Sequence, residues 1–353
     1  MKVAIMSGAF VNSGDFLIEQ RSRELIESIL CCDVEILKRN LAYDDKLNEL
    51  NKYDVIVFAG GPIFQPSMYP KRIPFVSNMQ KIEVPIRILG GGWKGRSEKE
   101  LYRNYAYTKD MMLFISSFSK QYSIGCRDWY TVRNLKRYGI DNLVMTGCPA
   151  WYDIGKIQNL KIKDIYSDIA IEDDIVIGIS DPAIADNKPY FYELINIISK
   201  HYSCVKIRLF FHRGISGEDQ KRLNKICQLN SAISFVDMSG TSDCFQEYNK
   251  CFMHIGFRVH AHIYNLSQGN ISILINEDAR GMGVNHALGI ENINCLLNGF
   301  NRLKVKIDSY LFERIILDYI NYIVQSDYAQ YHRAFLQIKE NFKVMEDFIS
   351  KMI

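Results

Sequence analysis

The stretch YDVIVFAGG, residues 53–61, joins a nearly continuous apolar run to a pair of glycines. Such a run, without regular polar alternation, is typical of a strand that is buried on both faces of a parallel sheet. The glycines directly after it predict a tight turn at the carboxyl end of that strand. The same order of strand, turn and helical pattern recurs along most of the chain, so this stretch indicates the fold class.

Working outward, the first half of the chain contains further apolar runs of strand length. The predicted strands are Lys2–Met6, Val34–Leu37, Tyr53–Phe58, Ile86–Leu89, Ser123–Cys126 and Leu143–Thr146. The spacing of Leu17, Leu25, Ile26 and Ile29 predicts a helix after the first strand, and Trp129–Tyr138 predicts another. Strands that alternate with helices form a parallel sheet with right-handed crossovers.

The alternation lapses in Asn159–Asp174, a polar and weakly periodic segment that we interpret as a linker. It then resumes with strands Asp174–Ser180, Val205–Phe211, Ile233–Met238, Cys251–Phe257 and Ile271–Asn276, and with helices Tyr190–His201 and Gly217–Cys227. We therefore predict an α/β protein of two tandem Rossmann-like domains with parallel sheets, residues 1–158 and 173–308. Helical spacing in 309–353 predicts C-terminal helices that pack across the domains.

The composition excludes several classes of protein. The 353 residues are 48% hydrophobic and 24% charged with a formal net charge of +3, so we expect no nucleic-acid partner. The nine cysteines are odd in number and form no CxxC pair, which favours a reducing compartment. No stretch approaches ~18 uninterrupted apolar residues, and MKVAIMSGAF lacks the apolar core of a signal peptide. We expect a cytoplasmic protein without a membrane span.

Polar side chains gather where the predicted strands end. Ligands of doubly wound sheets bind outside the carboxyl ends of the strands, and in two-domain proteins between the domains. The candidate site residues are Asn12, Gly14, Asp15, Gly60, Gly61, Gln65, Trp93, Lys94, Arg127, Asp128, His212, Arg213, Arg258, His260, His262, Glu277, Asp278 and Arg280. The cations among them outnumber the anions, which favours an anionic ligand.

Structural interpretations compete with these assignments in the first half of the chain. The pair Gly60–Gly61 lacks the GxGxxG and GxxxxGK[ST] patterns, so it is also explained as an ordinary tight turn. Asn12 and Asp15 are equally suited to cap the first helix. Arg127, with the aspartate that follows it, is equally explained as a helix cap with a surface ion pair.

The second half offers similar alternatives. His212 and Arg213 fit the solvated end of a strand. One of His260 and His262 is expected to be structural, because His262 follows His260 by two positions and the two side chains therefore face in different directions. Arg258 and His260 fit a hydrogen-bonded pair at a helix start. We favour a functional role for this pair, because the amide groups of a helix N-terminus at a strand end also point toward an anion.

Several segments, taken in order, are similar to the polysaccharide pyruvyl transferase family. They are NSGDFLI at 12–18, YDVIVFAGGPIFQ at 53–65, IGCRDWYTVRNLKRYGIDNLVMTGCPAW at 124–151, GFRVHAHIYNLSQGNISILI at 256–275 and DARGMGVNHALGI at 278–290. The order and spacing hold from residue 1 to about 295. The resemblance implies a GT-B-like fold and transfer of the pyruvyl skeleton from phosphoenolpyruvate to two hydroxyls of a sugar, which gives a pyruvate ketal.

The resemblance also implies roles for individual residues. Arg258 and His260 match the family's R-x-H pair that contacts the donor, Arg127 matches the arginine of its RD segment, and Asn12, Gly14 and Asp15 match its opening turn. We expect the following roles: His260 and Asp15 catalytic; Arg258, Arg127, Lys94, Gly60 and Gly61 donor-binding; Asn12, Gly14 and His212 acceptor-binding.

The implied chemistry suits these residue types. Arginine holds phosphate and carboxylate groups bidentately, and histidine has a pKa suited to a general acid near neutrality. The chain departs from the family at Pro62 in place of a third glycine, at Cys148 in place of an aspartate, at Arg280 in place of a lysine and in GGGWKG, residues 90–95. In this last segment Lys94 or Arg96 would replace a donor-binding histidine.

The expected partners are phosphoenolpyruvate and a saccharide or lipid-linked saccharide precursor of an exopolysaccharide. The sequence leaves peripheral membrane contact and homo-oligomer formation open. The histidines lack HExxH or His/Cys ligand spacing, so we expect no metal and no cofactor besides the donor substrate. Two other functions fit the same pattern: a GT-B glycosyltransferase that uses a nucleotide sugar, and a non-catalytic binding protein on this fold.

Overall fold

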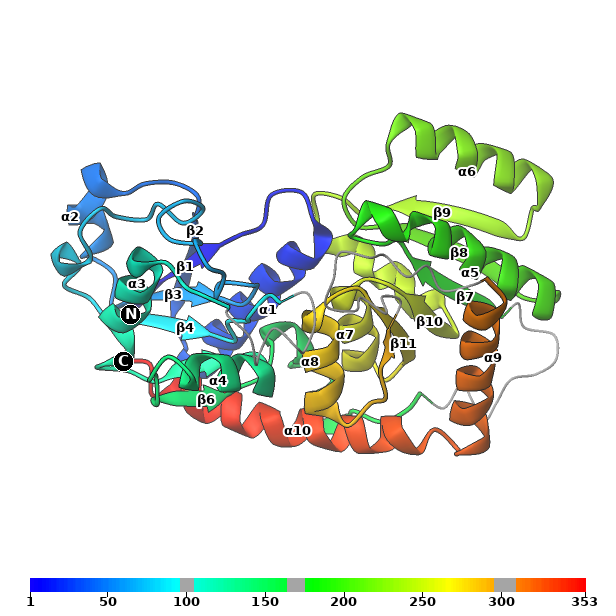
Figure 1. Ribbon diagram of the computed structural model, residues 1–353. Coiled ribbons are helices and arrows are strands. Elements are labelled where there is room, and N and C mark those ends of the chain that lie inside the picture. Colours follow the sequence, from blue (N-terminus) through cyan, green and yellow to red (C-terminus); the bar gives the residue numbers. More distant parts are fainter. Residues whose placement is uncertain (96–104, 164–174, 295–308) are drawn as a thin grey trace. The chain divides into compact units, whose positions relative to one another are not determined.

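The computed structural model describes residues 1–95, 105–163, 175–294 and 309–353, and these form two compact α/β units (Figure 1). Unit 1 contains Met1–Phe10, Asp15–Gln158 and Gln337–Ile353. Unit 2 contains Val11–Gly14 and Asn159–Leu336. Most of the predicted linker and residues 295–308 of the predicted second domain lie outside the described residues, as does Arg96.

Unit 1 is built on a parallel sheet with the strand order β2-β1-β3-β4. Its strands are β1 (Lys2–Ser7), β2 (Asp33–Lys38), β3 (Val55–Ala59) and β4 (Ile86–Leu89). A parallel pair, β5 (Ile124–Cys126) and β6 (Leu143–Met145), continues from β4 through a bridge between Gly91 and Cys126. Every residue of β3 and β4 is buried, as expected for strands covered on both faces.

Helices of unit 1 follow the strands less regularly than the sequence pattern predicts. They are α1 (Ser13–Leu30), α2 (Leu47–Leu50), α3 (Lys109–Ser119) and α4 (Trp129–Lys136). The connection from β3 to β4 contains Pro62, Pro66, Pro70, Pro74 and Pro85 and is mostly irregular. Proline removes backbone donors, so this segment contributes buried side chains to the core without forming a long helix.

Unit 2 contains a longer parallel sheet with the strand order β12-β11-β10-β7-β8-β9. Its strands are β7 (Val176–Ser180), β8 (Lys206–Phe211), β9 (Ile233–Asp237), β10 (Met253–Gly256), β11 (Ile271–Asn276) and β12 (Ile293–Asn294). The central strands β10 and β11 are wholly buried, whereas the edge strand β9 is partly exposed. The short β12 carries no apolar run and was not predicted from the sequence.

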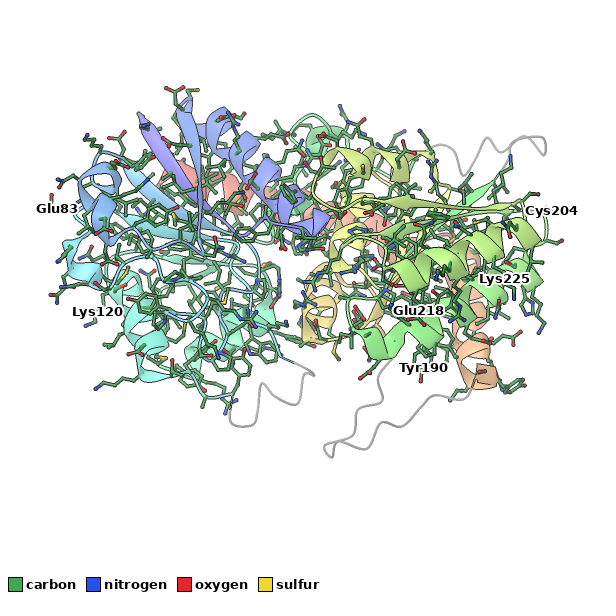
Figure 2. The ribbon with its side chains drawn as sticks, turned by 90° about the horizontal axis from the view of Figure 1, so that it is seen from above. Glu83, Lys120, Tyr190, Cys204, Glu218 and Lys225 are labelled. Carbon is green, nitrogen blue, oxygen red and sulfur yellow. The ribbon has the colours of Figure 1, made fainter. Side chains whose placement is uncertain are left out.

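The helices of unit 2 cover this sheet and extend to the chain end. They are α5 (Lys188–His201), α6 (Gly217–Leu229), α7 (Val259–Ser267), α8 (Ala279–Leu288), α9 (Ser309–Gln325) and the first part of α10 (Ala329–Ser350). Figure 2 shows Glu218 and Lys225 on the outer surface of α6, whose one buried residue is Leu223. The rest of α10 belongs to unit 1.

The prediction of two tandem Rossmann-like units with parallel sheets is confirmed. The predicted strands agree with the observed ones to within a few residues at each end, and Ile86–Leu89 and Ile271–Asn276 agree completely. Helices α2, α3 and α8 were not predicted. Within the ranges that the structure describes, no helix combines the length and apolar character that a membrane crossing requires.

Candidate functional site

The sheet of unit 2 has a topological switch point between β7 and β10. From β7 the chain proceeds outward to β8 and β9, then returns and places β10 on the other side of β7. The connections leave in opposite directions here, which opens a crevice at the carboxyl ends of these two strands. Asp181 follows β7 and Arg258 follows β10, so the strand order brings these residues together.

A pocket lies at this switch point. It is lined by Asn12, Ala183, His212, Arg213, Phe257, Arg258, Val259, His260, Glu277, Asp278 and Arg280. Four of the residues to which we assigned roles from the sequence, Asn12, His212, Arg258 and His260, therefore share one pocket. All the lining residues belong to unit 2.

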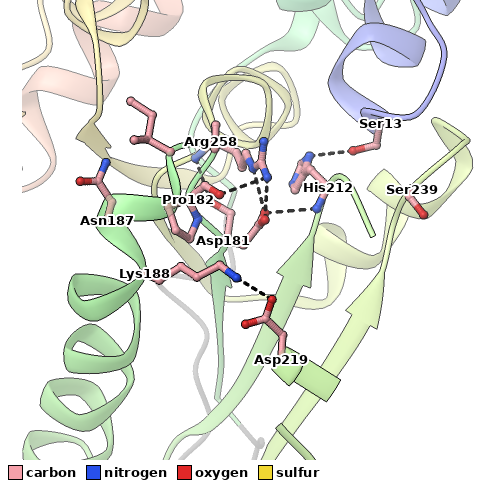
Figure 3. A network of polar contacts seen from close by, with 12 residues as sticks. Ser13, Asp181, Pro182, Asn187, Lys188, His212, Asp219, Ser239 and Arg258 are labelled. Atoms are coloured by element: carbon pink, nitrogen blue, oxygen red, sulfur yellow. Dashed lines mark hydrogen bonds and ion pairs between the residues drawn. The ribbon is translucent and has the colours of Figure 1, made fainter. Parts of the chain in front are cut away.

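Arg258 is held from one side by Asp181 (Figure 3). Its Nε donates to Oδ1 at 2.8 Å, and one terminal nitrogen, Nη2, donates to Oδ2 at 2.6 Å and to the Pro182 carbonyl at 3.2 Å. The Asp181 carboxylate also accepts from the His212 amide at 3.2 Å. Asp181 thereby links the ends of β7, β8 and β10, and Arg258 is 7% exposed.

This ion pair changes how Arg258 can meet an anion. The edge of the guanidinium formed by Nε and Nη2 is occupied, which leaves the second terminal nitrogen, Nη1, for a ligand. Arg213, at the end of β8, is exposed and lines the same pocket. An anion in the pocket would therefore be held by one nitrogen of Arg258 and by Arg213, in place of the bidentate grip by Arg258 that the sequence suggested.

His260 lies in the first turn of α7, two residues after the N-cap residue Arg258. Gly14, at the start of α1, lies directly against its ring: a Cβ atom built on Gly14 would be 2.4 Å from Nδ1 and 2.8 Å from the Cβ of His260. Real Cβ atoms do not approach other atoms so closely. The glycine therefore makes room for the imidazole, and the predicted site residues Gly14 and His260 are in fact neighbours.

His212 lines the pocket wall, but both of its ring nitrogens have partners inside the protein. Figure 3 shows the contact with Ser13. Nδ1 lies 2.7 Å from the hydroxyl of Ser13, and Nε2 lies 2.8 Å from the hydroxyl of Tyr248. Burial, helped by the nearby charge of Arg258, lowers the pKa of His212 well below its ordinary value. This geometry ties His212 to its neighbours, and an acceptor contact stays a prediction.

Two further histidines lie beneath the pocket and serve the structure. The hydroxyl of Ser272, on β11, is 2.7 Å from Nδ1 of His254 and 2.9 Å from Nδ1 of His262. His254 Nε2 lies 2.9 Å from the Ser180 hydroxyl, which accepts from the Arg258 amide at 3.1 Å. Burial lowers the pKa of His262 to about 3. Of the pair His260 and His262, the second is therefore the structural one.

Two acidic residues complete the pocket. Glu277 accepts hydrogen bonds from the amides of Ala183 and Ile184, at 2.8 and 2.9 Å, and from the Asn187 side chain at 2.8 Å. Burial raises the pKa of its carboxyl, although these bonds favour the ionised form. Asp278 caps α8 and pairs with Arg280 at 2.7 Å, so the charge of Arg280 is largely neutralised within the pocket wall.

Unit 1 has its own switch point, between β1 and β3, and two predicted residues lie there. Asp15 and Gly61 line a second pocket, together with Ile5, Ser7, Gly8, Ile18, Glu19, Arg39 and Ala59. Gly60 and Gly61 have φ values of +52° and +70°, which non-glycine residues rarely adopt. Their turn role is thus supported, while a donor contact stays a prediction.

The two predicted donor-binding cations of unit 1 have different surroundings. Arg127 is 2% exposed, donates to Asp128 at 3.0 Å and donates to the Trp93 carbonyl at 3.1 Å. Asp128 caps α4, so this pair has the structural role considered above, although it is buried and not at the surface. Lys94 is exposed. Neither side chain lines the pocket of unit 1.

The sequence analysis assigned no role to three residues at or beside these pockets. Asp181 stands in an unremarkable SDP segment, and only the pairing of β7 with β10 reveals its contact with Arg258. Arg213 was noted at a strand end but received no role. Arg39 follows β2, where the charged pair Lys38–Arg39 at a strand end was a usable signal. Among the residues that the structure describes, no three His, Cys, Asp or Glu side chains gather as metal ligands.

Comparison with known proteins gives a family and a fold. Residues 12–269, more than half of the chain, match the sequence profile of the family described as polysaccharide pyruvyl transferase. No curated protein matches the sequence significantly. Many solved structures share the fold at low sequence identity, and three of them are described next.

The UDP co-structure of MnaA from S. aureus has a TM-score of 0.57 at 11% identity and covers 95% of this chain and 90% of its own. UDP-GlcNAc 2-epimerase from Neisseria meningitidis, bound to UDP-GlcNAc, has a TM-score of 0.57 at 12% identity and covers 99% of both chains. A glycosyltransferase from Rickettsia africae ESF-5 has a TM-score of 0.53 at 12% identity, with 98% and 96% covered. At these identities the likeness establishes a GT-B-like fold alone.

Proposed function

The chain belongs to the polysaccharide pyruvyl transferase family, and from that premise we propose that it transfers a pyruvyl group from phosphoenolpyruvate to two hydroxyls of a saccharide. The family makes it a transferase that acts in polysaccharide modification. Three further details belong to the proposal: phosphoenolpyruvate as the donor, a pyruvate ketal as the product and a place in exopolysaccharide synthesis.

The observation that carries the proposal is that Arg213, Arg258 and His260 line one pocket at the start of α7. Phosphoenolpyruvate has two anionic groups and a carbon that must be protonated. Arg213 and the Nη1 nitrogen of Arg258 supply positive charge for the anions, and the first-turn amides of α7 add the positive end of a helix dipole. His260, in the same turn, supplies an imidazole, a side chain that can act as a general acid.

The chemistry assigns a task to each of these residues. His260 protonates the methylene carbon of the donor while a sugar hydroxyl adds to the neighbouring carbon. The bond from that carbon to the phosphate oxygen then breaks, the phosphate leaves with the electron pair, and an oxocarbenium-like centre develops. The arginines stabilise the departing phosphate. The second hydroxyl adds to this centre and loses its proton, which completes the ketal.

Asp15 is the proposed acceptor of a hydroxyl proton. It lines the pocket of unit 1, where a carboxylate can hydrogen-bond a sugar hydroxyl and polarise its O–H bond. The buried pair of Arg127 and Asp128 is proposed to hold the adjacent turn in shape, since both members are occupied by each other and by backbone groups.

The experiment is a donor and acceptor screen that measures released phosphate. The protein is incubated with phosphoenolpyruvate and a panel of saccharides and lipid-linked saccharides, and product ketals are identified by mass spectrometry. Phosphate release that requires an acceptor supports the proposal. UDP-GlcNAc serves as the second donor, because relatives in fold bind UDP or UDP-GlcNAc. Turnover of UDP-GlcNAc without phosphoenolpyruvate turnover would instead indicate a nucleotide-sugar transferase.

A third outcome of the same screen identifies a binding protein. If phosphoenolpyruvate raises the melting temperature but no acceptor gives phosphate release, then the pocket binds the donor without catalysis. The substitutions of Pro62, Cys148 and Arg280 relative to the family would then be the positions to revert, singly and together. Recovery of turnover in a revertant would assign the loss to that position.

A further inference from the structure

The pocket at the switch point of unit 1 is built around a single arginine. Arg39 follows β2 directly, and its side chain extends across the ends of the two neighbouring strands of the order β2-β1-β3. A Cβ atom on Gly8, after β1, would lie 2.2 Å from the guanidinium carbon of Arg39. One on Gly61, after β3, would lie 3.2 Å from a terminal nitrogen. Because neither glycine has a Cβ atom, the guanidinium of Arg39 fits against both of them.

Arg39, which is partly buried, differs from the buried arginines Arg127 and Arg258. Arg127 and Arg258 are bound to Asp128 and Asp181. In the described part of the chain, by contrast, the Arg39 guanidinium makes no hydrogen bond and no ion pair. Burial lowers the pKa of Arg39, and the nearby carboxylate of Asp15 opposes this effect. Arg39 is partly buried, and a partly buried charge without hydrogen-bond partners in the protein is suited to bind an external anion.

The acidic residues of the pocket do not neutralise Arg39 directly. Glu19 forms an ion pair with Lys38 at 3.3 Å, and Lys38 also donates to the Ala9 carbonyl at 3.1 Å. The negative charge of Asp15 has a favourable electrostatic effect on the charged form of Arg39. The pocket therefore offers a cation on one wall and a carboxylate, a hydrogen-bond acceptor, on another. A ligand that carries both an anionic group and hydroxyls matches this arrangement.

We infer that this pocket binds an anionic group of the saccharide acceptor, with Arg39 as its counter-ion and Asp15 facing its hydroxyls. The acceptor class is thus an acidic saccharide, one that bears a carboxylate or a phosphate. A guanidinium suits either anion, because both accept two parallel N–H bonds. The assignment of this ligand as the acceptor rests on the proposed function, whereas the anion site is inferred from Arg39 and its surroundings alone.

The test compares charged and neutral sugars on matched variants. Binding of methyl glucuronide, glucose 6-phosphate and methyl glucoside is measured by calorimetry for the wild type, Arg39→Gln, Arg39→Lys and Arg72→Gln. Arg72 is an exposed arginine of unit 1 outside the pocket, so Arg72→Gln removes the same charge without touching the site. Phosphate release from phosphoenolpyruvate is recorded in the same samples with each sugar as acceptor.

We expect the wild type to bind at least one charged sugar roughly 10- to 100-fold more tightly than methyl glucoside, the range for a charge-assisted pair. The stronger of the two charged sugars identifies the anion as carboxylate or phosphate. Arg39→Gln abolishes the preference, Arg39→Lys retains part of it, and Arg72→Gln retains all of it. Equal binding of charged and neutral sugars by the wild type, or an undiminished preference in Arg39→Gln, overturns the inference.

The two measurements separate this inference from the proposed function. An Arg39-dependent preference without phosphate release leaves the anion site intact and rejects pyruvyl transfer. Phosphate release at equal rates with neutral and acidic sugars supports pyruvyl transfer and rejects the acidic acceptor. Should Arg39→Gln fail to fold by circular dichroism, the wild-type preference and its partial loss in Arg39→Lys decide the question, because that variant keeps the charge.

Discussion

Arg258 has a structural role besides its proposed contact with the donor. Its ion pair with Asp181 is buried, and removing one partner of such a pair leaves an uncompensated charge inside the protein. A loss of activity in an Arg258 variant would therefore combine lost donor contact with lost stability. Arg213 has no such structural role, since it is exposed and makes no hydrogen bond among the described residues. It is the cleaner probe of anion binding.

The first prediction contrasts these two arginines. Arg213→Gln should weaken phosphoenolpyruvate binding roughly 10-fold or more while the melting temperature stays within about a degree, because only a ligand contact is lost. Arg258→Gln should lower stability by about 3–5 kcal/mol. The measurements are calorimetric donor affinity and thermal melts, with exposed Arg333→Gln as the control. Unchanged affinity in Arg213→Gln would remove Arg213 from the donor site.

The second prediction concerns His260. If it donates the proton, then His260→Asn should lower kcat by roughly 10²- to 10⁴-fold and leave donor affinity nearly unchanged. The exposed His332→Asn provides the matched control. Single-turnover phosphate release and equilibrium binding are measured on both variants. A wild-type kcat in His260→Asn would show that another group supplies the proton.

The third prediction uses the contact between Gly14 and His260. Gly14→Ala places a methyl group where the imidazole lies, so the ring must move, and a displacement of about 1 Å can reduce a rate by about 10²-fold. Alanine is otherwise favourable in a helix. The control is Gly217→Ala in α6, where nothing lies within 4 Å of the added atom. Equal kcat values for the two variants would contradict a positioned His260.

At the scale of elements, the strands β7, β10 and β11 and the helix α7 are joined by a buried polar network. Ser180, His254, Ser272 and His262 connect the three strands to the helix through side-chain hydrogen bonds. Burial lowers the pKa of His254 well below its ordinary value, and that of His262 to about 3. These histidines are therefore neutral in the folded protein near neutral pH, and the network fixes the position of the Arg258 amide.

The fourth prediction follows from the pKa of His262. An unfolded histidine takes up a proton near pH 6.5, whereas folded His262 does so only near pH 3. Between these values the unfolded chain binds more protons, so stability is fully present above about pH 6.5 and is lost as the pH falls. His254 and His212 act in the same direction.

Urea unfolding midpoints between pH 7 and pH 5 measure this effect. His262→Gln should be less stable at pH 7 because the Ser272 contact is altered, but its midpoint should fall less steeply with pH than that of the wild type. His332→Gln, at an exposed histidine, should keep the wild-type slope. Identical slopes for His262→Gln and the wild type would mean that His262 is not the source of the pH dependence.

At the scale of the whole molecule, the chain contains two Rossmann-like units, each with a pocket at its own switch point. The strand order differs between them: β2-β1-β3-β4 in unit 1 and β9-β8-β7-β10-β11-β12 in unit 2. In both units the first strand is central. The pocket lies at the switch point, between β1 and β3 in unit 1 and between β7 and β10 in unit 2. Repetition of one folding rule thus provides two pockets of different composition.

The fifth prediction concerns metal dependence of the whole reaction. Pyruvyl transfer through a histidine acid and arginine counter-ions requires no metal, so full phosphate release should persist after treatment with EDTA. The control is the same assay with added Mg²⁺ or Mn²⁺, which should give no stimulation. Activity that EDTA abolishes and a divalent ion restores would favour a nucleotide-sugar mechanism.

Local sequence was sufficient for most of the strands and for the fold class. Apolar runs such as Val55–Phe58 and Ile271–Ile275 signal strands because burial on both faces excludes polar side chains, and that requirement acts residue by residue. The glycines and charged residues after these runs marked the ends of the strands. Because ligands bind at these ends, they also identified Asn12, Arg258 and His260, which line the pocket of unit 2. Helix α3 and the irregular proline-rich segment after β3 were not predicted from the sequence. Their structure depends on packing against other segments and not on local periodicity.

The tertiary structure alone decided which of these polar residues have partners. Asp181 and Arg258 are 77 positions apart, and they meet only because the crossover after β9 returns β10 to the side of β7. Likewise, the sequence does not distinguish the roles of His254, His260 and His262. In the structure His254 and His262 are buried and structural, whereas His260 lines the pocket. Periodicity is a local property, whereas strand order and burial arise from packing between segments far apart in the chain.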